Sequence, residues 1–284
     1  MIEQFDVLIG GACKQVEKWT NREKPFKIIQ FPAHFFYIKH SKKGHILIDT
    51  GYSDYFFKET KTFPYSLYRK ITPLSFSNHE SAKHQLERLG VKASDVRYIF
   101  ITHFHGDHIA GLKDFPNAIF ICSKKAYESV KNLVGLKAVR NGFIPGFLPK
   151  DFLDRVKFLE EGPTYQEKVK NSWRLAKPGE PVFDVFGDGS LLSVDLSGHA
   201  IGQMGVYLSY KNRNIWLIAD AAWDSDGYRK NSMPTRLGRL VLNNYNEFKR
   251  SLLHIHHFAE KNQDVWIVPS HCREVEDQWK KMFS

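Results

Sequence analysis

Residues able to do metal chemistry gather in one short stretch, Thr-His-Phe-His-Gly-Asp-His, at residues 102–108. His103 and His105 lie two residues apart, so their side chains face the same side when the backbone is extended. A glycine then permits a tight turn, and Asp107 and His108 follow at the start of the next turn or helix. Neutral imidazoles and carboxylates are the ligands that suit zinc and similar transition metals. The stretch therefore predicts a metal site.

The chain positions this stretch at the end of an apolar run, residues 96–102, that predicts a buried strand. Three more polar residues follow predicted strands in the same way: His199 after 191–196, Asp220 after 215–219 and His271 after 265–268. Strand ends that present polar side chains at one rim of a sheet make a common site geometry. We therefore expect these strand ends to contribute to the same site.

The other predicted elements mix strands and helices. Further strands are expected at 35–38, 46–49, 118–122 and 205–209, and helices at 79–90, 124–133 and 245–261. Hairpins and helical crossovers are both present in this order. The pattern excludes all-α and all-β folds and predicts a layered α/β fold.

Composition favours one domain over residues 1–284. The chain has 284 residues, 42% of them hydrophobic, with no Pro/Gly/Ser-rich linker and no internal repeat. The first residues lack the pattern of a signal peptide, and no apolar stretch is long enough to span a bilayer. Its three cysteines have no paired spacing, so they predict free thiols in a reducing compartment. We expect a cytoplasmic protein with no membrane partner.

The net charge of +10 raises the question of a nucleic-acid partner. Lysine and arginine are spread along the chain, and the densest short groups, 39–43 and 280–281, are not long runs. This distribution is typical of a solvated basic surface. We therefore expect a small-molecule substrate and no nucleic-acid partner.

Five segments together resemble the metallo-β-lactamase superfamily. The HxHxDH signature is matched at 103–108, and the "GHTxGQ" segment is resembled by Gly-His-Ala-Ile-Gly-Gln at 198–203. Ile-Ala-Asp at 218–220 resembles the strand end with the bridging aspartate. Pro-Ser-His at 269–271 and Leu-Ile-Asp-Thr-Gly at 47–51 match two further segments. Each motif is weak alone, but the set spans nearly the whole chain.

The resemblance implies a four-layer αββα sandwich that holds two divalent metal ions. By this match the first ion would be held by His103, His105 and His199, the second by Asp107, His108 and His271, and both by Asp220. Zinc is the expected metal, although manganese, iron or cobalt could occupy the same ligands. No ligand is missing, which argues against a non-catalytic signalling or binding member. It also argues against the flavin-linked di-iron oxygen reductases, which have Glu in place of His105.

Two metals roughly 3.5–4 Å apart can share a hydroxide that is a nucleophile at neutral pH. Asp107 and Asp220 offset only part of the metal charge, so the site would favour a developing oxyanion. The reaction class is therefore hydrolysis of an ester, lactone, thioester, amide or phosphoester.

The branch that the chain most resembles is the lactonase-like one, which includes N-acyl homoserine lactone hydrolases and related esterases. Chain length and the segments 183–190 and 198–205 support this resemblance. It implies attack on the lactone or ester carbonyl of a small, partly apolar substrate. A glyoxalase-II-like thioesterase and a phosphodiesterase or nuclease of the same superfamily remain alternatives, because they would share every ligand.

One position departs from the lactonase pattern. Lactonases of this branch place Tyr three residues after the bridging aspartate, where this chain has Trp223. An indole N–H can donate a hydrogen bond but is a poor proton donor for a leaving alkoxide. Trp223 is thus either a catalytic neighbour of the substrate or an aromatic of the pocket wall or core.

Insertions are expected near 52–78 and 123–190. Residues 52–78 and 140–153 are rich in aromatic side chains and punctuated by proline. They could form an apolar substrate pocket. They could equally form a homodimer interface or plain packing.

Overall fold

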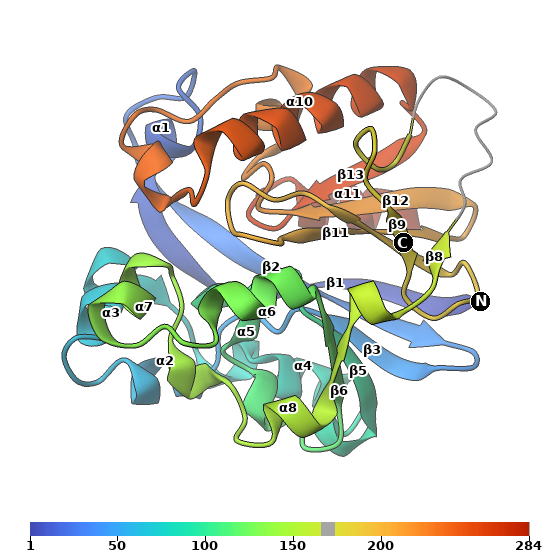
Figure 1. The fold of residues 1–284 in the computed structure, drawn as a ribbon, viewed down its shortest axis with the longest axis horizontal. Coiled ribbons are helices and arrows are strands. Elements are labelled where there is room, and N and C mark those ends of the chain that lie inside the picture. Colours follow the sequence, from blue (N-terminus) through green and yellow to red (C-terminus); the bar gives the residue numbers. More distant parts are fainter. Residues whose placement is uncertain (166–173, 284) are drawn as a thin grey trace. The chain divides into compact units, whose positions relative to one another are not determined.

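The computed structural model describes residues 1–165 and 174–283, and the chain divides into two compact units (Figure 1). Unit 1 comprises Met1–Gln15 and Ile28–Lys157, and unit 2 comprises Val16–Lys27 and Phe158–Ser284. Part of the insertion expected near 123–190, residues 166–173, lies outside the described residues.

Unit 1 is built on a seven-stranded sheet with the order β4-β1-β2-β3-β5-β6-β7. The strands are β1 (Ile2–Val16), β2 (Ile28–His40), β3 (Gly44–Ile48), β4 (Leu74–Ser75), β5 (Val96–Phe100), β6 (Ile119–Cys122) and β7 (Val156–Phe158). β2 and β3 form the predicted hairpin, with Phe36 opposite Ile48. β3, β5 and β6 run parallel, so their carboxyl ends reach the same edge of the sheet.

Short helices connect the strands of unit 1. They are α2 (Asp54–Glu59), α3 (Ser66–Ile71), α4 (Ala82–Arg88), α5 (Gly106–Ile109), α6 (Lys124–Val130), α7 (Gly135–Arg140) and α8 (Phe152–Arg155). The helix predicted over 79–90 is divided into a 3₁₀ turn, Asn78–Glu80, and α4. Ser81 has an extended backbone and accepts a hydrogen bond from the His84 N–H, so it caps a new helix where the apolar pattern predicted one continuous helix.

The strand β1 was not predicted, because Gly10 and Gly11 interrupt its apolar pattern. The structure gives the reason for the first of these glycines. A Cβ on Gly10 would lie 2.7 Å from the Cα of Gly51, and the Gly10 carbonyl accepts a hydrogen bond from the N–H of Tyr52. The glycine therefore lets β1 contact the loop after β3 backbone to backbone.

Several aromatic residues of segments 52–78 and 140–153 are buried in the core of unit 1. Phe56 is fully buried and its ring lies 5.0 Å from that of Tyr52, 5.7 Å from Tyr68 and 6.0 Å from Phe147. These contacts join segment 52–78 to segment 140–153. Of the predicted alternatives, these four residues therefore show packing within one chain.

Unit 2 is built on a six-stranded sheet with the order β13-β12-β11-β10-β9-β8. Its strands are β8 (Thr164–Tyr165), β9 (Val182–Asp184), β10 (Leu191–Asp195), β11 (Met204–Tyr210), β12 (Arg213–Ala219) and β13 (Val265–Pro269), and its helices are α1 (Glu17–Thr20), α9 (Ser225–Arg229), α10 (Tyr245–Lys261) and α11 (Val275–Phe283). β10, β11 and β12 are antiparallel neighbours, and β13 runs parallel to β12. The parallel pair brings the ends of β12 and β13 to the same edge.

The long helix α10 lies along this sheet (Figure 1). Its buried residues Phe248, Leu252, Ile255 and Phe258 recur at helical spacing and form one apolar face. That face packs in one cluster with strand residues such as Trp216, whose ring lies 4.6 Å from that of Phe258. Both units thus combine a sheet with helices, which agrees with the predicted α/β class. Among the described residues, no helix has the length and apolar character needed to cross a membrane.

Asp114 is a partly buried carboxyl at the end of a 3₁₀ turn, Leu112–Asp114. Burial raises the pKa of Asp114 to about 6, against the opposing effect of Lys83 and with a smaller contribution from Asp54. In the unfolded chain an aspartate titrates near pH 4. The folded state therefore binds the proton more tightly, and its stability falls as pH rises through about 4 to 6.

Asp114→Asn should accordingly stabilise the protein in a pH-dependent way. Above about pH 7 the substitution removes a desolvated charge and should raise the free energy of unfolding by on the order of 1–2 kcal/mol. Below about pH 4 the wild-type carboxyl is itself neutral, so the difference should vanish. Urea titrations at both pH values measure this, with exposed Asp154→Asn as the control. An equal effect at both pH values would contradict the assigned pKa.

Candidate metal centre

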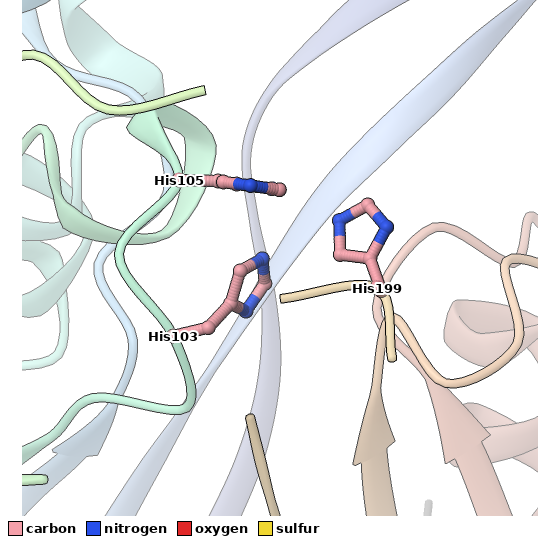
Figure 2. A group of neighbouring side chains, drawn as sticks. All are labelled: His103, His105 and His199. Carbon is pink, nitrogen blue, oxygen red and sulfur yellow. The ribbon is translucent and has the colours of Figure 1, made fainter. Parts of the chain in front are cut away.

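Unit 1 brings together four of the predicted ligands. β5 ends at Phe100, and the loop after it leads into α5 (Gly106–Ile109), so His103 and His105 lie on the loop (Figure 2). His108 lies on the helix. The imidazole centroid of His103 lies 4.5 Å from that of His105 and 4.1 Å from that of His108. The Asp107 carboxylate lies 3.9 Å from Nε2 of His108. The four residues that lie close together in the sequence therefore also form one cluster in the structure.

A buried carboxylate, Asp49, orients this cluster. Its Oδ2 lies 2.7 Å from Nδ1 of His108, and Thr102 donates to Asp49 from both its backbone N–H and its hydroxyl. Because Nδ1 of His108 faces Asp49, Nε2 is the nitrogen left to bind a metal. From the sequence, Asp49 belonged to a matched motif but had no predicted role. The feature that could have indicated this role is its position at the end of β3, the strand parallel to β5.

The aromatic segments meet the same loop. A Cβ on Gly106 would lie 2.8 Å from the Tyr68 ring and 2.9 Å from the Phe147 ring, so only glycine leaves room for them. Gly142 likewise lies against the His105 imidazole, where a Cβ would be 2.6 Å from the ring, and its carbonyl accepts a hydrogen bond from the Gly106 N–H. The segments at 52–78 and 140–153 therefore help to fix the ligand loop.

Unit 2 brings together the other three predicted ligands. His199 lies on the loop after β10 (Figure 2), and Asp220 and His271 follow the parallel strands β12 and β13. The Oδ2 atom of Asp220 lies 3.3 Å from Nε2 of His199 and 3.0 Å from Nε2 of His271. All three side chains are buried. Two imidazole nitrogens and one carboxylate oxygen thus converge at one edge of the unit 2 sheet.

Trp223 packs against this second cluster. Its ring lies edge-on to the His199 imidazole, with centroids 5.5 Å apart, and is tilted against Phe248 at 5.7 Å. The side chain is buried. The structure thus places Trp223 beside His199, one of the predicted ligands.

The donors of both units fit a divalent transition metal. The His and Asp side chains that could hold a metal ion in the described part of the chain are the seven predicted from the sequence. Imidazole nitrogen and carboxylate oxygen are the usual ligands of zinc outside thiolate sites. The carboxylate behind His108 adds the support that metal-binding histidines commonly have.

Comparison with known proteins identifies relatives over most of the chain. A family model described as Metallo-beta-lactamase superfamily matches residues 29–256. The N-acyl homoserine lactonase AttM of Rhizobium radiobacter is 26% identical over 263 residues, which cover 89% of this chain and 86% of the relative.

Solved structures show the same fold. An N-acyl homoserine lactone hydrolase with the product N-hexanoyl-L-homoserine at its catalytic metal centre matches with a TM-score of 0.70 and 17% identity, covering 98% of this chain and 96% of that one. AidC, a dizinc quorum-quenching lactonase, matches with a TM-score of 0.62 and 17% identity, covering 95% and 87%. These likenesses confirm the predicted mixed α/β fold with two sheets.

Asp49→Ala should destabilise unit 1 and disorder the His108 ring, because three donors lose a buried acceptor. We expect the free energy of unfolding to fall by about 3–5 kcal/mol. Chemical denaturation measures this, with Asp95→Ala at an exposed aspartate as the control, for which less than about 0.5 kcal/mol is expected. Equal effects of the two variants would contradict the role assigned to Asp49.

Proposed function

We propose a hydrolytic function from this family assignment: the chain belongs to the metallo-β-lactamase superfamily, whose model covers parts of both units. Relatives and structural neighbours in this superfamily are metal-dependent hydrolases, and the class of enzyme is the same here. That residues 1–284 form one domain of this fold remains part of the proposal. The observation that carries the proposal is the complete set of seven His and Asp ligands.

The seven side chains would hold two metal ions. His103, His105 and His199 would bind one ion, Asp107, His108 and His271 the other, and Asp220 both. The two clusters converge within their own units, which supports a ligand set that is ready before a metal arrives. When bound, two divalent metals supply Lewis acidity and lower the pKa of water. Zinc is the metal that we propose, as in the dizinc neighbour.

The residues of this chain would then orient the ligands and handle protons. Asp49 holds the His108 ring in one orientation through Nδ1. Asp107 is partly exposed, with 14% of its side chain accessible, so its carboxylate lies where a substrate could reach it. Asp220 is buried between two imidazoles, where Oδ2 would take a proton from the attacking water and pass it to the leaving oxygen of the substrate.

The proposed substrate is a lactone or ester of a small, partly apolar molecule. The named activity of AttM and of the structural neighbours, hydrolysis of N-acyl homoserine lactones, supports this choice. Trp223 stands where a lactonase-like tyrosine is expected, so we assign it to the wall of the site and not to proton donation.

The first test combines metal content with a substrate panel. Zinc-loaded wild type should hold about two metal ions per chain and hydrolyse N-hexanoyl homoserine lactone or a simple aryl ester. His105→Ala should lose part of the metal, and its kcat/KM should fall about 100-fold or more, because one ligand is missing. His257→Ala, at an exposed histidine, is the matched control and should behave as wild type.

Other outcomes would redirect or refute the assignment. Turnover of bis-p-nitrophenyl phosphate alone would replace it with a phosphodiesterase, and turnover of S-lactoylglutathione alone with a thioesterase. Absence of bound metal, or activity that His105→Ala leaves unchanged, would refute the metal site.

Substitutions at Trp223 distinguish two roles for its side chain: an aromatic wall of the site, or a hydrogen-bond donor in catalysis. Trp223→Phe keeps an aromatic ring against His199 but removes the indole N–H, and we expect kcat/KM to change by less than about 3-fold. Trp223→Ala removes the ring and should cost about 10-fold or more. Steady-state kinetics with the preferred ester or lactone decide the point. A 10-fold loss in Trp223→Phe would instead show that the N–H contributes to catalysis.

A further inference from the structure

Unit 2 contains a buried ammonium group that the proposed chemistry does not use. The Lys177 side chain is only 8% exposed, and a lysine is seldom buried without partners. Its Nζ donates to Oδ1 of Asp195 at 3.1 Å and to Oγ of Ser251 at 3.3 Å, and it lies 3.4 Å from Oε2 of Glu180. The first two of these partners are themselves bound to the same neighbour.

That neighbour is Ser197. Asp195 accepts hydrogen bonds from both the N–H and the hydroxyl of Ser197, each at 2.8 Å. Ser251 donates its hydroxyl proton to the Ser197 carbonyl at 2.7 Å. Because that proton is already used, the Ser251 oxygen can only accept from Lys177, so every hydrogen bond in the network has one consistent direction. Asp195 and Ser251 are thus both hydrogen-bonded to Ser197, and Lys177 is hydrogen-bonded to both of them.

Ser197 begins the loop that carries His199. The Ser197 hydroxyl also accepts a hydrogen bond from the N–H of Gly202, which closes the loop. On its other side the loop contacts the start of α10: Asn243 donates to the His199 carbonyl, and a Cβ on Gly198 would lie 2.1 Å from the N atom of Phe248. The position of His199 is therefore set by the network at one end of the loop and by α10 at the other.

We propose that Lys177 is a positioning residue, which holds Asp195 and Ser251 on Ser197 and thereby fixes His199 for metal binding. The effect of Lys177 on metal binding rests on the proposed function, whereas its effect on the position of loop 197–202 does not. Without the ammonium, the Asp195 carboxylate loses its charged partner and the buried Ser251 oxygen loses its donor. Both groups would then turn to other partners, and the loop would open more often.

The test uses Lys177→Met, which keeps most of the side-chain length and removes the charge, with exposed Lys249→Met as the matched control. Hydrogen exchange in the metal-free protein should be about 10-fold faster or more at the amides of Ser197 and Gly202 and unchanged in β11–β13. Chelator competition should then show one of the two zinc equivalents bound about 10–100-fold more weakly, and the other bound as in wild type.

Each outcome decides a separate claim. Unchanged exchange at the loop, or exchange that rises uniformly over unit 2, would overturn the positioning role. Faster loop exchange with unchanged affinity for both zinc equivalents would overturn its consequence for the metal. A wild type that binds no zinc would refute the proposed function, while a local change in exchange would still support the loop contact. If Lys177→Met does not fold, Asp195→Asn replaces it with the same expected pattern, and unchanged loop exchange there overturns the proposal.

Discussion

The hydrogen bonds to the buried carboxylate of Asp49 are the interactions on which the unit 1 cluster depends. Asp49 has a φ of 60°, a conformation that non-glycine residues seldom adopt, and its two oxygens bind Thr102 and His108. The end of β3 is thereby tied to the loop after β5, its parallel neighbour. Backbone strain and a buried charge are both tolerated here because three donors satisfy the carboxylate.

In unit 2, different residues hold the loop that carries a proposed ligand. Its ligands also follow strand ends, and Ala219 adopts a φ of 47° just before Asp220, where the pairing of β12 with β13 shifts register. The loop of His199 is supported by a second carboxylate, Asp195, whose charge is balanced by Lys177. In both units a carboxylate outside the proposed ligand set is hydrogen-bonded to the loop that carries proposed ligands.

The positions of the seven proposed ligands could be expected from sequence, whereas the residues that support them could not. Apolar strands that end in His or Asp are a local pattern, and the resemblance to the metallo-β-lactamase motifs grouped these residues into two metal sites. The role of Asp49 depends on parallel pairing of β3 with β5, and that of Lys177 on contacts with residues up to 74 positions away. β1 was missed because Gly10 and Gly11 interrupt its apolar pattern, although Gly10 serves a close backbone contact with Gly51. The aromatic segments were recognised, but not their packing against Gly106.

The proposed function requires the seven proposed ligands to hold two metal ions. Anomalous diffraction from a crystal of the zinc-loaded protein, recorded on both sides of the zinc absorption edge, tests it most directly. We expect two peaks roughly 3.5–4 Å apart, with Asp220 in contact with both. Two peaks in separate places, or ligands supplied by one unit only, would contradict it.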